Sequence, residues 1–136
     1  PFEEKGEIAD VCEEYGIAII SLIAPTSKER IRAIAREAEG FIYVVSSLGV
    51  TGVRSEITTD VKEMTDMVRQ VTDVPCAIGF GISRPDQAAR MAKVSDGAIV
   101  GSAIVRLVGE YKEACISEVS AYVKEMKAAV MQASDL

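Results

Sequence analysis

The sequence predicts an α/β protein built on a parallel sheet, and two observations lead to this fold class. Short continuous apolar runs rich in β-branched residues recur along the chain, which is typical of strands covered on both faces. Amphipathic segments with helical spacing separate these runs, and such alternation predicts parallel strands joined by right-handed crossovers. Because 136 residues without a recognisable linker suit one core, we expect a single domain over residues 1–136.

The predicted elements follow in the order helix, then four strand–helix units. Helical spacing of apolar residues up to Gly16 predicts the first helix. The strands are predicted at residues 17–23, 41–46, 76–80 and 97–100. N-cap patterns predict the starts of three connecting helices, namely Thr26 with Glu29, Asp60 with Glu63, and Ser83 with Asp86. A short helix is expected from Ser102, and a last amphipathic helix carries an apolar stripe from Val119 to Val130.

Two architectures fit this order of elements. A flavodoxin-like open sheet needs four or five strands and would be complete within the chain. A TIM (β/α)₈ barrel needs eight strands and about 250 residues, so the chain would supply about half of it. The periodicity of the sequence does not choose between the two.

The composition excludes several classes of function. Fifteen basic and twenty-one acidic side chains give a net charge of −6, whereas nucleic acids and anionic membranes need dense positive charge. The chain contains no histidine, which excludes a histidine-based triad or a histidine-ligated metal within it. Apolar runs are shorter than the roughly 18 residues of a membrane span, and the charged start is unlike a signal peptide. Three widely spaced cysteines predict a reducing, cytoplasmic location and no metal site.

Glycine-rich turns at two consecutive strand ends predict an anion site. Residues 79–82 read GFGI and residues 101–105 read GSAIV, and each stretch leads from a strand into a helix. Glycine lets the backbone approach an anion closely, and helix N-termini supply N–H donors, so the two turns favour phosphate. The loop at residues 47–59 also follows a strand, and its length and glycines predict a lid over such a site. The alternatives are tight turns without a ligand and a surface loop.

Three motifs together resemble one enzyme family. They are residues 43–52 (YVVSSLGVTG), 79–83 (GFGIS) and 101–105 (GSAIV). In this order and spacing they resemble the α subunit of tryptophan synthase, as do residues 22–27 (LIAPTS) and 123–129 (VKEMKAA). The resemblance covers essentially the whole chain, which would be the C-terminal half of that family's (β/α)₈ barrel.

The resemblance implies an enzyme that cleaves indole-3-glycerol phosphate to indole and glyceraldehyde 3-phosphate. It implies no cofactor on this subunit and a β subunit as partner, which carries pyridoxal phosphate and consumes the indole. Carried over by position, the backbone phosphate site comprises Gly52, Gly81, Gly101 and Ser102. Tyr43 and Phe80 resemble part of the indole-side pocket, and Thr51 resembles a lid threonine that bonds a catalytic carboxylate.

The family's catalytic groups are expected outside this chain. They are a Glu and an Asp on the first strands and loops of the barrel, and cleavage needs such an acid and base. Within the chain, Glu56 on the lid-like loop is the candidate substitute, although it also reads as a solvated charge. Asp60 is interpreted as a helix cap, and Asp96 is predicted at the wrong end of the sheet. We therefore expect phosphate binding without catalysis by this chain alone.

Two other functions stay open at this point. One is another phosphosugar barrel enzyme, such as a phosphoribosyl isomerase, against which the GVTG stretch at residues 49–52 argues. The other is a non-catalytic half-barrel that binds phosphate esters or self-associates, because two open sheet edges are prone to pairing.

Overall fold

The computed structural model describes residues 2–46, 54–79 and 81–134, with side chains except those of residues 54–60 and 134. The strands are β1 (Ser21–Ile23), β2 (Ile42–Val45), β3 (Cys76–Gly79) and β4 (Gly97–Ala98). The helices, with η for 3₁₀ turns, are η1 (Phe2–Glu4), α1 (Gly6–Glu14), α2 (Lys28–Arg36), α3 (Arg54–Arg69), α4 (Pro85–Ala92), α5 (Ser102–Tyr111), η2 (Lys112–Ala114) and α6 (Cys115–Ser134).

Within the described ranges, the strands form one parallel sheet in the chain order β1-β2-β3-β4. Tyr43 of β2 pairs with Leu22 of β1 and Ala77 of β3, and Ile78 of β3 pairs with Ala98 of β4. Chain order with parallel pairing requires each crossover helix to return the chain to the same end of the sheet. The predicted alternation of four parallel strands with helices is therefore confirmed.

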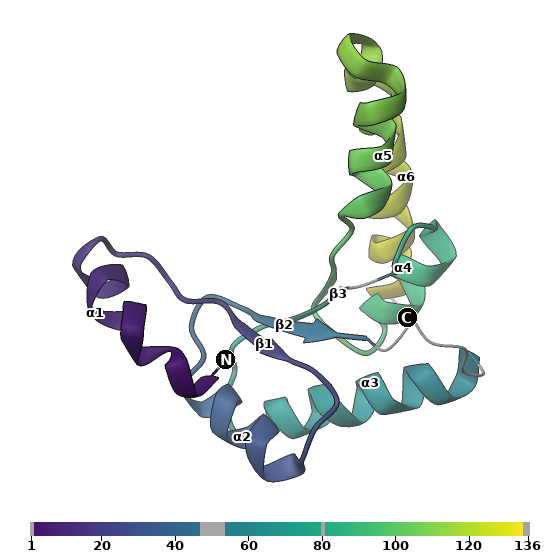
Figure 1. Ribbon diagram of the computed structural model, residues 1–136. Helices are drawn as coiled ribbons and strands as arrows, with labels where there is room; N and C mark the ends of the chain where they lie inside the picture. The colour runs from purple at the N-terminus through teal and green to yellow at the C-terminus, as the bar shows by residue number, and fades with distance from the viewer. Residues whose placement is uncertain (1, 47–53, 80, 135–136) are drawn as a thin grey trace.

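The hydrophobic core lies between the sheet and its crossover helices. Alternate residues of the central strands, Ile42, Val44, Cys76 and Ile78, are fully buried. They share one cluster with apolar residues of α2 and α3 such as Ile31, Ile34, Val61 and Val68. Figure 1 shows α2 and α3 on the same side of the sheet. We call this the helix-covered face, and the opposite face, which carries Tyr43, Val45 and Ala77, the inner face.

The two outer strands are shorter than predicted. Residues 17–20 and 99–100 lie outside β1 and β4, although both segments are apolar. β1 and β4 are the edges of the described sheet, so each has a ladder on one side only. A strand pattern in the sequence predicts extended backbone, but a strand also needs a neighbour to pair with.

Three predicted helix starts are wrong by one to several residues. Helix α3 begins at Arg54 rather than Asp60, so the predicted loop 47–59 is shorter; its residues 47–53 lie outside the described part of the chain. Helix α2 is capped by Ser27 rather than Thr26, because the Ser27 Oγ accepts the Arg30 N–H at 3.3 Å. Helix α4 has Arg84 at its N-cap rather than Ser83.

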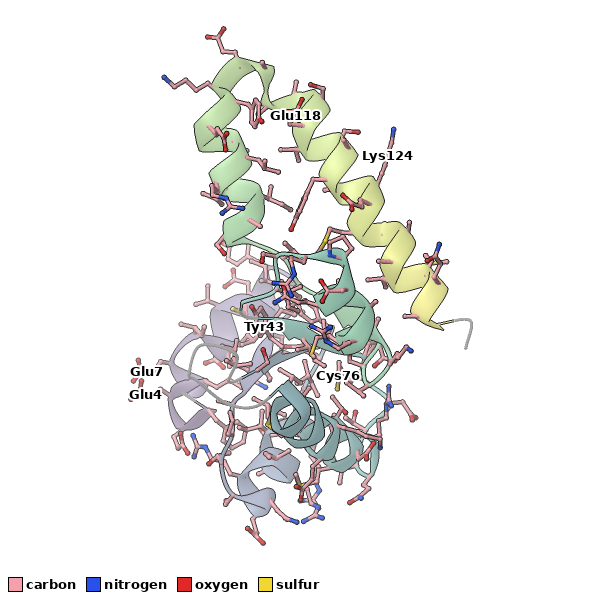
Figure 2. All side chains as sticks on the ribbon, turned by 90° about the vertical axis from the view of Figure 1, so that its right-hand side faces the viewer. Glu4, Glu7, Tyr43, Cys76, Glu118 and Lys124 are labelled. Atoms are coloured by element: carbon pink, nitrogen blue, oxygen red, sulfur yellow. The ribbon has the colours of Figure 1, made fainter. Side chains whose placement is uncertain are left out.

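Helices α5 and α6 form a hairpin that stands away from the sheet, with α4 at its base (Figure 1). Helix α6 packs against both α4 and α5. In Figure 2, Tyr43 and Cys76 lie within the body of the molecule, whereas Glu118 and Lys124 lie on the projecting part of α6. No helix in the described ranges is long and apolar enough to cross a lipid bilayer.

Candidate functional site

The carboxyl ends of β2, β3 and β4 meet at one edge of the sheet, as parallel pairing requires. Ser46, directly after β2, is fully buried. Its backbone N–H donates to the Gly79 carbonyl oxygen at 3.1 Å, and its hydroxyl donates to the same oxygen at 3.0 Å. The Ile99 N–H donates to the Ile78 carbonyl oxygen at 2.7 Å. These bonds hold the three strand ends side by side where the glycine turns begin.

The turn after β3 has a backbone that requires glycine. Gly81 has φ +75°, in the left-handed region that costs other residues about 1–2 kcal/mol. Ile82, next to it, is buried with 3% of its surface exposed and anchors the turn in the core. The Gln87 side-chain oxygen accepts the N–H groups of Ser83 and Arg84, both at 3.0 Å. No acceptor for the N–H groups of Gly81 and Ile82 occurs among the described residues.

The turn after β4 ends in the exposed N-terminus of α5. Gly101 is the N-cap, and its carbonyl oxygen accepts the N–H groups of Ile104 and Val105 at 2.9 and 3.1 Å. The N–H groups of Ser102 and Ala103 have no acceptor within the described ranges. Ser102 is exposed, so its hydroxyl lies beside these donors at the same helix end. Free N–H groups and the positive end of the helix dipole together favour an anion.

The described carboxylates near the sheet ends are not placed for acid–base chemistry. Asp86, in the first turn of α4, is bonded by Arg84 at 3.0 Å and by Arg90 at 2.8 Å. These contacts, of which the bond from Arg84 has the larger effect, hold the pKa of the Asp86 carboxyl below its ordinary value. Asp86 therefore stays ionised and paired. Asp96 accepts the Cys76 N–H at 2.8 Å. That bond lies at the amino-terminal ends of β3 and β4, which confirms that Asp96 is at the wrong end of the sheet for the site.

Tyr43 lies on the inner face and its ring covers Gly79. A Cβ atom added to Gly79 would lie 2.0 Å from the Tyr43 hydroxyl oxygen and 2.3 Å from the carbon that carries it. Gly79 therefore has no room for a side chain while Tyr43 keeps this position. The Tyr43 ring of β2 thus occupies the space that a side chain at Gly79 of β3 would take.

The structure describes only part of the site predicted from the sequence. Gly81, Gly101 and Ser102 lie at the carboxyl ends of the adjacent strands β3 and β4, whereas Thr51, Gly52 and Phe80 are outside the described residues. The predicted loop position of Glu56 is wrong, because Glu56 belongs to helix α3, and its side chain is outside the described part of the chain. In the described part of the chain, no group of three or more Cys, Asp or Glu side chains is placed to hold a metal ion.

Sequence reasoning missed two polar side chains that shape this edge. Gln87 carries a usable signal, because it follows Arg84 by three residues, the spacing of a capping side chain. Ser46 carries no such signal, because a serine at a strand end is common in loops and its partner, the Gly79 carbonyl, is 33 residues away.

Replacing Gly101 with alanine tests whether the helix end binds an anion. A Cβ at Gly101 would meet no atom of the described residues within 4 Å, so this glycine is not required by the fold. The lost N-cap preference and the reduced freedom of the unfolded chain oppose each other at about 1 kcal/mol each, so stability should change little. The added methyl would occupy the space of a bound oxygen, and we expect affinity for glycerol 3-phosphate to fall at least about tenfold, which is about 1.4 kcal/mol.

Isothermal titration and thermal unfolding of the same variant measure the two quantities. Gly109→Ala is the matched control, because Gly109 is exposed within the same helix and a Cβ there would also meet nothing among the described residues. That control should gain about 1 kcal/mol of stability and keep its affinity. Equal affinity of Gly101→Ala and the unchanged chain would contradict an anion site at the start of α5.

Comparison with known proteins identifies relatives along nearly the whole chain. A family model described as tryptophan synthase alpha chain matches residues 1–131. The tryptophan synthase alpha chain of Lacticaseibacillus casei is 48% identical over 130 residues, which are 96% of this chain and 49% of the relative. That of Lactiplantibacillus plantarum is 55% identical over 115 residues, 84% of this chain and 44% of the relative. The chain thus spans about half the length of the curated relatives it matches.

Solved structures give the same correspondence in three dimensions. Tryptophan synthase subunit alpha from Campylobacter jejuni superimposes with a TM-score of 0.80 at 35% identity, over 88% of this chain and 49% of that chain. The tryptophan synthase alpha chain from Legionella pneumophila gives 0.75 at 30% identity, over 96% of this chain and 48% of that one. The four parallel strands are therefore those of half a (β/α)₈ barrel, which decides between the two architectures that the sequence left open.

Proposed function

The chain belongs to the tryptophan synthase alpha chain family, and on that premise we propose that it is the phosphate-binding C-terminal half of an indole-3-glycerol-phosphate lyase. The activity is the cleavage of indole-3-glycerol phosphate to indole and glyceraldehyde 3-phosphate. The observation that carries the proposal is the pair of neighbouring turns at Gly81 and Gly101, each with N–H groups that lack acceptors among the described residues. Such backbone donors hold a phosphate without a basic side chain.

The proposal assigns different parts of the substrate to different residues. Gly81, Gly101 and Ser102, together with Gly52, hold the phosphate. Tyr43 and Phe80 border the indole side, and Thr51 supports the lid. Tyr43 supports this division by its position on the inner face, where it is half-buried and its ring is fixed against Gly79.

Catalysis requires groups that this chain does not supply. Carbon–carbon cleavage needs an acid to protonate the indole carbon and a base near the glycerol hydroxyl and the indole N–H. The chain has no histidine, and the described carboxylates Asp86 and Asp96 are engaged elsewhere. We therefore assign the catalytic Glu and Asp to the N-terminal half of the barrel and expect no turnover by the chain alone.

The open edges of the sheet support the need for a second half. Ile17 and Leu22 beside the β1 edge have 59% and 61% of their surface exposed. On the β4 side, a groove of about 350 Å³ is lined by Val100, Val123 and Met126 among others. Apolar surface at both edges is what four further strands would cover when the barrel closes.

The wider setting follows from the same premise. We propose that the complete protein works with a tryptophan synthase β subunit, which consumes the indole and carries the pyridoxal phosphate, so that the α chain itself holds no cofactor. A cytoplasmic location agrees with the three cysteines, all of which are free in the structure. Tryptophan synthesis is then the pathway that this chain serves.

Reconstitution tests the proposed function. The chain would be mixed with a polypeptide that carries the first four strand–helix units of the Lacticaseibacillus casei relative, and indole release from indole-3-glycerol phosphate would be followed. Neither polypeptide alone should release indole, and the mixture should. A Gly101→Asp chain should assemble but lose activity, since its carboxylate repels the phosphate, whereas Gly109→Asp should assemble and remain active.

Two outcomes would contradict the proposal. Indole release by this chain alone would show that the catalytic groups are misassigned. Assembly of the two halves in analytical ultracentrifugation without any indole release would argue against the lyase activity itself. If the copies of this chain pair with each other instead, the sedimenting mass will show it before the second polypeptide is added.

A further inference from the structure

One hydrogen bond connects α6 to the turn after β3. The Tyr122 hydroxyl donates to the Ser83 carbonyl oxygen at 2.9 Å, although the two residues are 39 positions apart. Tyr122 is half-buried on the side of α6 that packs against α4 and α5. Burial raises the pKa of the Tyr122 hydroxyl above its ordinary value; Arg106 opposes this and Glu125 adds to it. The hydroxyl therefore keeps its proton at neutral pH and can donate it.

The same side chain also borders the start of α5. Tyr122 lines the groove of about 350 Å³ together with Val100, just before the Gly101 turn, and Ile104, in the first turn of α5. Arg106, two residues further along α5, lies close enough to influence the pKa of the hydroxyl. Tyr122 therefore bonds to the turn after β3 through its hydroxyl, and it lines one groove with residues on both sides of the Gly101 turn.

The backbone of the turn after β3 needs restraint from other parts of the chain. Glycine populates left-handed and right-handed backbone about equally, so Gly81 does not by itself hold its φ of +75°. The buried Ile82 side chain fixes the turn on the core side, and Gln87 fixes the Ser83 and Arg84 N–H groups toward α4. The bond from Tyr122 holds the Ser83 carbonyl, one residue beyond Ile82, and so restrains the turn from the side of α6.

We propose that Tyr122 is a positioning residue of the phosphate site, whose hydroxyl sets the Gly81–Ser83 turn relative to the N-terminus of α5 so that both sets of N–H groups face one anion. The inference rests on the proposed function, because it presumes that these two turns bind the phosphate of the substrate. It assigns to α6 a part in substrate affinity that acts through the turn after β3.

Tyr122→Phe tests this role, because it removes the hydroxyl and keeps the ring in the groove. Isotope-labelled chain would be titrated with glycerol 3-phosphate and the backbone N–H resonances followed. We expect an affinity roughly three- to tenfold weaker, which converts to about 0.65–1.4 kcal/mol. The ligand-induced shift of the Gly81 resonance should shrink, while that of Gly101 persists. Tyr111→Phe is the matched control and should bind normally, since no hydrogen bond of the Tyr111 hydroxyl occurs among the described residues.

A second variant separates positioning from general loosening of the helix. Met126 lies one turn beyond Tyr122 on α6 and is buried, with 7% of its surface exposed. Met126→Ala should lower the melting temperature more than Tyr122→Phe does, yet leave the affinity of the folded chain within about twofold, because it removes core packing and keeps the Tyr122 hydroxyl. Weakening by Met126→Ala as large as that by Tyr122→Phe would overturn the positioning role. So would unchanged affinity in Tyr122→Phe.

The titration also distinguishes this inference from the proposed function. If the unchanged chain binds glycerol 3-phosphate at the Gly81 and Gly101 resonances and Tyr122→Phe binds equally well, only the role of Tyr122 fails. If the unchanged chain shifts neither resonance at any glycerol 3-phosphate concentration, the phosphate site fails and the role of Tyr122 falls with it.

Discussion

Replacing Ile78 with alanine is expected to lower the free energy of unfolding by about 2–5 kcal/mol, the range for removing most of a buried isoleucine. Ile78 is fully buried in β3, where it pairs with Val44 on one side and Ala98 on the other. It belongs to the cluster that joins the sheet to the crossover helices. The cavity left by the substitution would lie between rigid elements on several sides, so little of it can close by relaxation.

Urea unfolding followed by circular dichroism measures this loss. Ile17→Ala removes the same atoms from a side chain with 59% of its surface exposed and should change the stability by less than about 0.5 kcal/mol. A loss of that small size for Ile78→Ala would mean that the core does not lie between the sheet and helices α2 and α3. Complete unfolding of the variant would instead agree with the marginal stability expected of a half-barrel.

The order of the strands could be predicted because it depends on local patterns. Each apolar run, such as residues 41–46, which contain β2, and residues 76–80, which contain β3, is bounded by glycine or proline and followed by an amphipathic segment. These features fix which segments are extended and force parallel pairing. Strand length could not be predicted at the edges. Residues 17–20 and 99–100 have strand composition, but pairing depends on a neighbour that the local sequence does not contain.

Helix starts were less predictable because several residues can cap a helix. Thr26 and Ser27 are both suitable N-cap residues for α2, and the backbone conformation determines which of them caps the helix. Ser27 has φ −63° and ψ 149°, the extended conformation of an N-cap residue. For α4, a signal existed that favours Arg84. Pro85 suits the first helical position and restricts the residue before it to extended backbone, as Arg84 shows with φ −126° and ψ 149°.

The candidate site was predictable where it depends on glycine and not where it depends on distant partners. The exits of β3 and β4 carry glycines in local motifs, so Gly81 and Gly101 could be singled out from the sequence. The bond from Tyr122 to Ser83 spans 39 residues. In the sequence, Tyr122 reads as one more apolar position on a helical stripe, and its hydroxyl gives no hint of a partner. The crowding of Gly79 by Tyr43 is equally invisible, because it depends on the register between β2 and β3.

Replacing Gly79 with alanine is expected to destabilise the chain by about 1–3 kcal/mol, the usual cost of overpacking, and to move the Tyr43 ring off the sheet. The new Cβ would lie 2.0 Å from the Tyr43 hydroxyl oxygen, far inside van der Waals contact. The nearest atoms belong to the end of the tyrosine side chain, so the ring can rotate away more easily than the backbone can move. In the assembled enzyme, a displaced ring on the proposed indole side should raise KM for indole-3-glycerol phosphate.

A double-mutant cycle separates this clash from other effects of the substitution. With Tyr43→Ala in the background, Gly79→Ala has nothing to displace, so its cost should shrink by a coupling energy of about 0.5–3 kcal/mol. Gly97→Ala is the matched control in the neighbouring strand, because a Cβ there would meet the Ala77 Cβ at an ordinary 3.8 Å. Its effect should be small and the same with or without Tyr43. If the effects of Gly79→Ala and Tyr43→Ala simply add, the ring does not lie over Gly79 in solution, and Tyr43 loses its fixed place beside the substrate.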